Sequence, residues 1–436
     1  MMEIERRFIV YLDILTGLES SHHVLIVKTG VKSVLLSHPN LFLHENANRS
    51  MHTSNRYSLL ISMFYRFLSR ESKYKGIDVS QFDVIADNND IKRWQVCRQE
   101  ERLRKQSAKP SSATIYDDAK FILYYFSWLS HAGFVTTVNV KSKTWVATVK
   151  SDRLLNYTRP QERTAIDHRN IEVLDQEHRQ ARLQYLITNQ EIKLLLGSYR
   201  DAVYVAMFKM GLGTAMRPMD LVKFPYIGRG SNKHILPYSD MDILASKVVD
   251  YTVENSKGGK TRKIKINVAD LKALEDGYLS QCYHERARLY AKRYGKKCPP
   301  SVLFLNRFGV PVTPKMISDA TTFAKKRAIE IFPNFREGVN FYEARHWWPT
   351  MFLIRFFGDR LLSESADALY AAAAEVLKNQ MGHEDIATTY RFYIDKARLV
   401  AMGSRGFVNE IIASPGMNVE SFIDEIEAQA GALIGA

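Results

Sequence analysis

The spacing of hydrophobic residues changes along this chain and divides it into segments. Between residues 50 and 135, apolar side chains recur at helical spacing. They form two stripes, Tyr57, Leu60, Ile61, Phe64 and Leu68, then Ile115, Ala119, Ile122, Leu123, Phe126 and Leu129. The stripes predict amphipathic helices in a small domain that we place at residues 46–135. Residues 1–45 carry short β-prone runs, which form either a separate arm domain or an extension of the helical one.

A second domain begins at a clear helix start. Thr188 and Glu191 have the spacing of a capping box, in which each side chain bonds to the other residue's backbone N–H, and an apolar run follows. Most of the stretch from 316 to 400 has helical character. We predict a second domain at residues 186–412 that is α+β, mostly helical with a small antiparallel β-sheet.

Two segments flank this second domain. Residues 136–185 are β-prone at first and then polar, and we interpret them as a linker that could wrap around a partner. Residues 413–436 contain an apolar stripe at helical spacing with acidic residues beside it, which predicts an amphipathic C-terminal helix. That helix docks either on its own domain or on a neighbouring copy of the chain.

Composition narrows the classes of partner. With 61 Lys+Arg against 47 Asp+Glu, the formal net charge of +14 favours nucleic acid first and an acidic membrane second. No apolar run reaches the length of a membrane span, and no signal peptide is evident at the start, so we expect no membrane partner. Cys97, Cys282 and Cys298 have no CxxC spacing, which argues against disulfides and a zinc site and predicts a cytoplasmic protein.

One predicted helix, residues 91–105, is rich in cations. Its candidate contacts to a nucleic-acid backbone are Lys92, Arg93, Arg98 and Arg102. The alternative is an ordinary solvated charged face.

A first candidate phosphate site surrounds Arg217. Gly211 and Gly213 before it are expected to allow a tight turn. Because Arg217 precedes Pro218, its backbone is biased towards an extended conformation, and Pro218 suits the first position of a short helix. A guanidinium beside free backbone N–H groups is well placed for a phosphate oxygen. Asp220 could orient it or cap the helix, although such a pair in a loop is often only structural.

A second candidate is a lysine in a β-hairpin. The runs 243–251 and 263–266 are predicted to be strands around a Gly-Gly turn. Lys257, beside this turn, could donate a proton to a leaving oxygen. Lys260 and Arg262 are candidate DNA contacts, with a solvated basic turn as the alternative.

A third candidate segment contains Tyr342, Arg345 and His346, followed by Trp347-Trp348. We expect the tryptophan pair to pack against the Arg345 guanidinium. An aromatic core segment with a buried arginine ion pair is the alternative.

The fourth segment combines an imidazole with a phenol. His383 follows a glycine, Thr388-Thr389 would cap the next helix, and Tyr393 lies ten residues after His383. A phenol, with a pKa of about 10, is a poor nucleophile at neutral pH. It becomes useful when cations already clamp a phosphodiester.

In this order the four segments resemble those of the tyrosine recombinase (phage integrase) family. The matching residues are Ala215-Met-Arg217 with Asp220-Leu221, Lys257, Tyr342 to His346, and Gly382-His383 with Thr388-Thr389 and Tyr393. The resemblance covers residues 188–400. It implies an all-α, SAM-like core-binding domain before the catalytic domain.

The resemblance implies a catalytic set. Tyr393 would attack DNA to give a 3′-phosphotyrosine, with Arg217 and Arg345 on the phosphate oxygens, Lys257 protonating the 5′-oxygen and His383 assisting. Secondary candidates are Asp220, Tyr342 and His346.

The sequence also departs from the family pattern. Tyr342 stands where the family usually has His or Lys. The family places its nucleophile nine or ten residues after the histidine. Nine leads to Phe392, which has no hydroxyl, so Tyr393 is expected and Tyr390 is the alternative.

The implied function is a site-specific recombinase of a mobile genetic element, associated with the bacterial nucleoid. It would act on double-stranded DNA with specific recombination sites, as a homotetrameric synapse and with accessory DNA-bending proteins. No cofactor or metal is expected, since neither a carboxylate cluster nor an ATP-binding loop is evident. The alternatives are a type IB topoisomerase-like nicking-closing enzyme and a catalytically inactive DNA-binding regulator.

Overall fold

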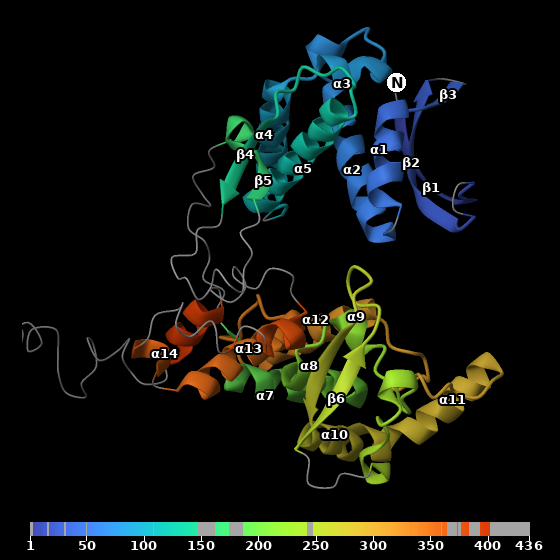
Figure 1. Ribbon diagram of the computed structural model, residues 1–436, viewed down its shortest axis with the longest axis vertical. Helices are drawn as coiled ribbons and strands as arrows, with labels where there is room; N and C mark the ends of the chain where they lie inside the picture. The colour runs from blue at the N-terminus through green and yellow to red at the C-terminus, as the bar shows by residue number, and fades with distance from the viewer. Residues whose placement is uncertain are drawn as a thin grey trace, which may run out of the picture. The chain divides into compact units, whose positions relative to one another are not determined.

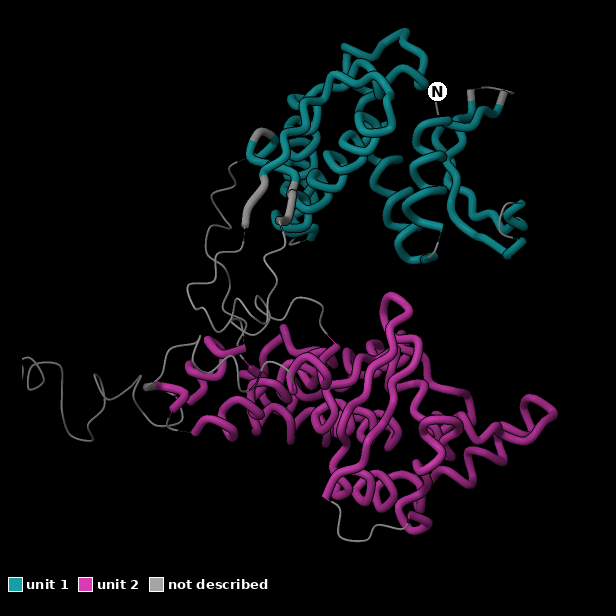
Figure 2. Tube along the Cα trace, viewed as in Figure 1, with its two compact units in different colours: residues 1–182 teal, residues 183–436 magenta. Residues whose placement is uncertain are grey.

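The computed structural model describes residues 3–14, 17–29, 32–48, 50–107, 109–146, 162–173, 186–241, 247–358, 360–363, 373, 376–382 and 393–401. The chain divides into two compact units, residues 1–182 and residues 183–436 (Figure 2). Each unit has its own hydrophobic core.

The first unit joins an antiparallel sheet of order β1-β2-β3 to a group of helices (Figure 1). Its elements are β1 Glu3–Leu12, β2 Glu19–Thr29, β3 Lys32–Leu35, α1 Ser37–Ala47, α2 Met51–Leu68, α3 Phe82–Ile85, α4 Asn88–Arg104, α5 Ser112–His131, β4 Lys141–Val146 and β5 Glu162–Asp167. Short 3₁₀ turns are η1 Ser72–Tyr74, η2 Val79–Gln81 and η3 Arg169–Ile171.

The sheet and the helices of this unit share one core. Ile4 and Leu25 from the strands are buried in the same cluster as Phe42, Phe64 and Phe126 from α1, α2 and α5. The predicted apolar stripes of α2 and α5 face this core, which confirms both helices. The β-prone runs that the sequence left unassigned therefore extend the core of the helices.

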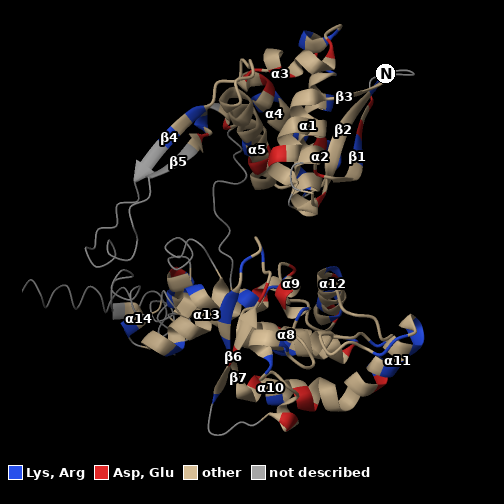
Figure 3. Cartoon of the chain, turned by 45° about the vertical axis from the view of Figure 1, so that its right-hand side comes forward, with Lys and Arg blue, Asp and Glu red and all other residues tan. Residues whose placement is uncertain are grey.

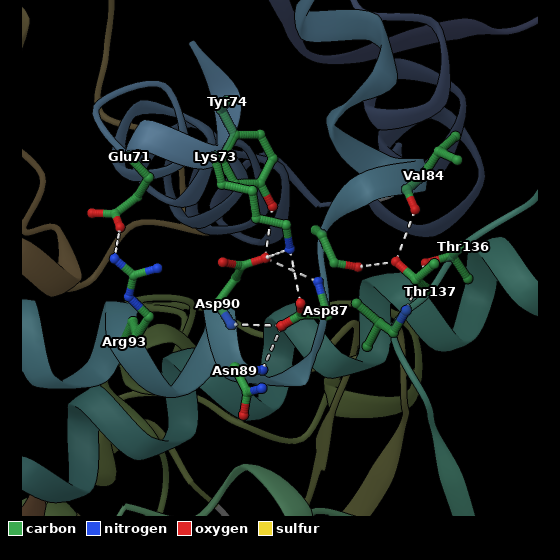
Figure 4. A network of polar contacts seen from close by, with 12 residues as sticks. Glu71, Lys73, Tyr74, Val84, Asp87, Asn89, Asp90, Arg93, Thr136 and Thr137 are labelled. Atoms are coloured by element: carbon green, nitrogen blue, oxygen red, sulfur yellow. Dashed lines mark hydrogen bonds and ion pairs between the residues drawn. The ribbon is translucent and has the colours of Figure 1, made fainter. Parts of the chain in front are cut away.

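A polar network anchors the start of α4 (Figure 4). Asp87 and Asp90 form a capping box, so both carboxylates satisfy backbone N–H groups at the positive end of the helix. Lys73 Nζ lies 2.8 Å from an oxygen of each carboxylate, and Tyr74 Oη donates to Asp90 Oδ2 at 2.7 Å. The network ties η1 to the basic helix.

Part of the segment predicted to be a linker is folded. Strands β4 and β5 pair antiparallel, with Lys141 opposite Asp167. Further on, Ile171 is buried in the core of this unit, and its carbonyl accepts a hydrogen bond from Gln95 Nε2 at 2.6 Å. The prediction of a linker over residues 136–185 missed this pairing because the two strands are separated by a long polar stretch.

The second unit is mostly helical and contains one β-hairpin (Figure 1). Its elements are α7 Asn189–Ser198, α8 Ala202–Thr214, α9 Pro218–Leu221, β6 Val248–Val253, β7 Arg262–Asn267, α10 Val268–Leu274, the π-helix η7 Glu275–Tyr283, α11 His284–Tyr294, α12 Pro314–Ile331, α13 Tyr342–Phe357 and α14 Arg360–Ser363. Short 3₁₀ turns are η5 Gly230–Asn232 and η6 Tyr238–Asp240, and residues 376–381 and 393–401 are also helical.

Helix α8 packs against α13, η7, α10 and β7. It therefore connects the hairpin to the helix that contains Arg345. The hairpin is confirmed: Tyr251 pairs with Ile264. Gly258 and Gly259 have φ of 79° and 71°, which a residue with a Cβ adopts at a cost. The fold class, mostly α with small antiparallel sheets, is confirmed.

Two further features depend on which residues the structure describes. The predicted C-terminal helix at residues 413–436 lies outside them. Among them, no helix combines the length and apolar character needed to cross a membrane.

The capping box of α7 gives a stability prediction. Thr188 Oγ1 accepts from Glu191 N at 3.1 Å, and Glu191 Oε2 accepts from Thr188 N at 2.8 Å, as the sequence predicts. Thr188→Ala should lower the free energy of unfolding by about 1 kcal/mol, because the N–H of Glu191 loses its acceptor. Thr322→Ala, on the exposed side of α12, is the control and should cost less. Urea titrations measure both, and equal losses would contradict the assignment.

Candidate active site

The turn between α8 and α9 is made by an alanine. Gly211 and Gly213 lie inside α8, where a Cβ on Gly213 would collide with the Asp270 carboxylate. The predicted glycine turn is therefore wrong: these glycines allow close packing. The left-handed residue that ends α8 is Ala215, with φ of 56°. Its carbonyl accepts a hydrogen bond from Arg345 Nη1.

Arg217 occupies the N-cap of α9, with Pro218 in the first turn, as the sequence predicts. Its extended backbone (φ −71°, ψ 153°) follows from the steric demand of the proline ring. Arg217 Nη2 donates to the Gly382 carbonyl at 3.3 Å, and Nη1 lies 3.4 Å from Ser256 Oγ. The guanidinium thus lies between the hairpin and the residue before His383.

Arg345, in the first turn of α13, is only 1% exposed. Its guanidinium donates to the carbonyls of Ala215 and Met381. The centroid of the Tyr342 ring lies 6.0 Å from Arg345 Cζ. Trp348 stacks on Phe352, with the two ring centroids 5.2 Å apart.

The two guanidinium groups make this site electrostatically positive. Burial, together with the charge of Arg217, lowers the pKa of Arg345 to about 10. Two cations held close to one another repel, and a bound anion relieves that repulsion. A phosphate oxygen matches the planar donors of arginine. The pair therefore suits a phosphodiester.

The segment that leads to His383 is fixed by a buried glutamine. Gln380 Nε2 donates to the carbonyls of Thr214 and Lys265, both at 3.0 Å, and its Oε1 accepts from Lys265 N at 3.1 Å. Residue 380 is thereby tied to the end of α8 and to β7. Sequence reasoning missed this residue, since a lone glutamine in a helical run carries no local signal.

The Asp220 carboxylate hydrogen-bonds to residues of the β-hairpin and not to Arg217. Its buried Oδ2 accepts from Ser256 Oγ and from Arg262 Nη2, each at 3.0 Å, whereas Arg217 Nη1 is 4.0 Å away. Arg262, predicted to contact DNA, is instead largely buried within the site. Lys257 and Lys260 are exposed near the hairpin tip.

Tyr393 begins the helical residues 393–401, and its hydroxyl lies 2.8 Å from His346 Nδ1. The tyrosine is 2% exposed, and burial raises the pKa of its phenol. Burial, assisted by the charges of Lys396 and Arg345, lowers the pKa of His346 to about 4. The imidazole is therefore neutral at neutral pH, and its Nδ1 accepts the phenolic hydrogen bond in the tautomer that carries its proton on Nε2.

Two more ionisable groups lie near this pair. Lys396, one turn after Tyr393, is buried, and burial lowers the pKa of its ammonium. Burial raises the pKa of Glu343, in the first turn of α13, and the Lys396 charge opposes that shift. Sequence reasoning missed both residues because their effect depends on burial.

Other predicted residues of this segment lie outside the described part of the chain. These are His383, Thr388-Thr389, Tyr390 and Phe392. Within the described part, no group of three or more His, Cys, Asp or Glu residues could hold a metal ion.

Three cations of α4, Arg93, Arg98 and Arg102, have partners inside the first unit. Arg93 pairs with Glu71 (Figure 4), and Arg98 Nη1 lies 2.6 Å from Asp118 Oδ2. Arg102 Nη1 lies 2.9 Å from Ser112 Oγ. Lys92 is half-buried. Figure 3 shows further Lys and Arg residues spread over both units, including the end of α11.

Comparison with known proteins gives structural likenesses only. No family model and no curated protein matches the sequence. The solved structure of XerH site-specific recombinase bound to palindromic difH substrate is 15% identical, with a TM-score of 0.47 over 82% of this chain and 80% of that one. Tn1549 transposon integrase with circular intermediate DNA is 16% identical, with a TM-score of 0.46 over 84% and 98%.

A lambda integrase (75–356) dimer bound to a COC′ core site is 12% identical, with a TM-score of 0.42 over 83% of this chain and 95% of that one. The similar solved structures named here are thus recombinases and integrases. All three TM-scores are below 0.5, so the residues of the site, rather than these likenesses, carry the functional proposal.

The depressed pKa of His346 predicts a pH-dependent stability. The unfolded chain binds a proton at this histidine near its ordinary pKa, whereas the folded chain does so only near pH 4. The contribution of His346 to the free energy of unfolding is therefore fully present above about pH 6.5 and is lost as pH falls towards 4. Between pH 7.5 and 5 the loss should be about 2 kcal/mol.

Urea titrations of the wild type and His346→Gln at pH 7.5 and pH 5 measure the contribution of His346 to the free energy of unfolding. The stability difference between the two proteins should shift in favour of the variant at pH 5. His284→Gln, which changes an exposed histidine of α11, is the control. A His346→Gln difference that stays constant with pH would show that the imidazole titrates normally.

Proposed function

We propose that this chain is a site-specific DNA recombinase that cleaves and rejoins strands through a phosphotyrosine at Tyr393. One observation carries the proposal: two guanidinium groups, Arg217 and Arg345, converge on the Met381-Gly382 backbone, and Arg345 and Arg217 both influence the pKa of the buried Tyr393. This tyrosine also has a neutral imidazole as its hydrogen-bond partner. Those residue types suit phosphoryl transfer to a tyrosine.

In the proposed reaction, Tyr393 Oη attacks the phosphorus and forms a new P–O bond. The phenolic proton passes to His346 Nδ1, 2.8 Å away. The bond from phosphorus to the 5′-oxygen breaks, and the ammonium of Lys257 gives its proton to that oxygen. Arg217 and Arg345 offset the charge that grows on the non-bridging oxygens. A 5′-hydroxyl from a second duplex reverses the steps and joins the strands.

His346 takes a proton-accepting role that Tyr342 is poorly suited to perform. Tyr342 is 39% exposed, and its phenol is a weak base at neutral pH. The imidazole, by contrast, lies one helical turn along the same face of α13 and within hydrogen-bond distance of the nucleophile. The remaining role for the Tyr342 hydroxyl is a hydrogen bond to a phosphate of the DNA substrate.

The wider function belongs to the same proposal. Double-stranded DNA with specific recombination sites is the substrate, and the net charge of +14 favours it. Of the predicted DNA contacts, Arg262 is assigned to the site. The other candidates for the DNA backbone are Lys92, Arg93, Arg98, Arg102 and Lys260. A homotetramer, accessory DNA-bending proteins and a mobile genetic element complete the proposal, and localisation is with the bacterial nucleoid in the cytoplasm.

A covalent trapping assay tests the chemistry. The substrate is a nicked duplex carrying the attachment site identified from the DNA that flanks the gene. Wild type should form an adduct that survives a denaturing gel. Tyr393→Phe should form none, and Tyr390→Phe should still form one. His346→Gln should slow adduct formation about 10²–10⁴-fold, because general-base assistance is lost.

The same assay separates the alternatives. An inactive DNA-binding regulator would retain the duplex without an adduct, which would overturn the proposal. A topoisomerase-like enzyme would form adducts on DNA of many sequences and relax supercoils without paired sites. Adducts confined to one site, with exchange between two duplexes, are expected for the recombinase.

A further inference from the structure

A third arginine, Arg262, is largely buried within the candidate active site. Arg262, at the start of β7, donates from Nη2 to Asp220 Oδ2 at 3.0 Å and from Nη1 to Ser256 Oγ at 2.9 Å. Ser256 Oγ in turn donates to Asp220 Oδ2 at 3.0 Å. Three side chains from three places in the sequence thus form a closed triangle.

One member of this triangle, Ser256, directly precedes Lys257 in the sequence. Ser256 is buried, and its backbone N–H also donates to the Lys260 carbonyl at 2.8 Å across the hairpin tip. Lys257 itself is exposed. The hydroxyl of Ser256 therefore fixes the base from which the lysine side chain extends.

The other end of Arg262 lies against the glycine that precedes His383. Gly382 has φ of 62°, and a Cβ added there would lie 2.6 Å from Arg262 Cδ and 2.9 Å from Nε. The Gly382 carbonyl also accepts from Arg217. One guanidinium is thus packed between the hairpin, the Arg217 segment and residue 382.

An ion pair buried in this way is an expensive means of stabilising a fold. Desolvation lowers the pKa of Arg262, while the Asp220 charge opposes that shift. Well-packed apolar residues of similar volume often stabilise as much or more. What the charged triangle supplies is direction, since each hydrogen bond fixes the placement of its partner.

We propose that Arg262 is a positioning residue for the hairpin lysine. Through Asp220 and Ser256, it holds Lys257 where its ammonium can protonate the departing 5′-oxygen. This inference rests on the proposed function. Arg262 differs from Arg217 and Arg345 in that it acts through Lys257 and does not bind the reacting phosphate.

A modified substrate isolates that role. When sulfur replaces the bridging 5′-oxygen, Tyr393 Oη still forms the bond to phosphorus, and the P–S bond breaks. Sulfur leaves with the electron pair as a thiolate, which needs no proton because a thiol has a pKa of about 8.5. A defect in proton donation therefore disappears on this substrate, whereas a defect in phosphate binding or folding persists.

The measurement is the single-turnover rate of adduct formation by the full-length protein on matched oxygen and sulfur substrates. Arg262→Gln should slow cleavage of the oxygen substrate about 10²-fold or more, in the range of general-acid effects, and should cleave the sulfur substrate at close to the wild-type rate. Lys257→Ala should behave in the same way. Arg217→Ala should be slow on both.

Each outcome decides the question. Equal slowing of Arg262→Gln on both substrates, or no slowing on either, overturns the positioning role. If Arg262→Gln fails to fold, Ser256→Ala removes the hydroxyl that joins Arg262 and Asp220 to the residue before Lys257, and it leaves the Arg262–Asp220 pair in place. This variant should show the same sulfur rescue, although more weakly, and equal slowing on both substrates would overturn the positioning role. A wild-type protein that cleaves neither substrate contradicts the proposed function itself, which separates that failure from this one.

Discussion

The arrangement of the candidate active site depends on the burial of the Arg345 guanidinium. A cation that is 1% exposed must have its N–H groups satisfied, and here two of them bond to the carbonyls of Ala215 and Met381. Those two carbonyls belong to the end of α8 and to the segment before His383. One side chain therefore joins α8, α13 and residue 381, and the left-handed conformation of Ala215 is part of the same arrangement.

Resting protonation states follow from the same burial. Low solvent access raises the pKa of Tyr393 and lowers that of His346, so both groups are neutral at neutral pH. Tyr393 is held as a phenol, with His346 Nδ1 2.8 Å from its hydroxyl. In the proposed reaction, negative charge develops only when a phosphodiester lies against the arginines, which provides a physical reason for the phenol to remain unreactive without DNA.

Features governed by local backbone chemistry could be predicted from the sequence. The extended Arg217 before Pro218, the capping box at Thr188 and the hairpin around Gly258-Gly259 each follow from steric or hydrogen-bonding rules over a few residues. The four segments also singled out Arg217 and Arg345, which bond to the neighbouring carbonyls of Gly382 and Met381. All of these signals are contained within short stretches of sequence.

Features governed by tertiary contact could not be predicted in this way. His346 and Tyr393 are 47 residues apart, and nothing in their spacing indicates that their side chains meet. Arg262 resembled a surface cation until its burial beside Asp220 was visible. Ala215 adopts a conformation that favours glycine, so the sequence pointed to the wrong residues for the turn.

The central claim, that Tyr393 is the nucleophile, is tested most directly by locating the covalent bond. The adduct on nicked DNA is digested with nuclease and trypsin, and the modified peptide is identified by mass spectrometry. Cleavage after Lys378, Arg391 and Lys396 places Tyr390 in peptide 379–391 and Tyr393 in peptide 392–396. We expect a nucleotide joined through its 3′-phosphate to peptide 392–396, and modification of peptide 379–391 or of any other tyrosine would contradict Tyr393 as the nucleophile.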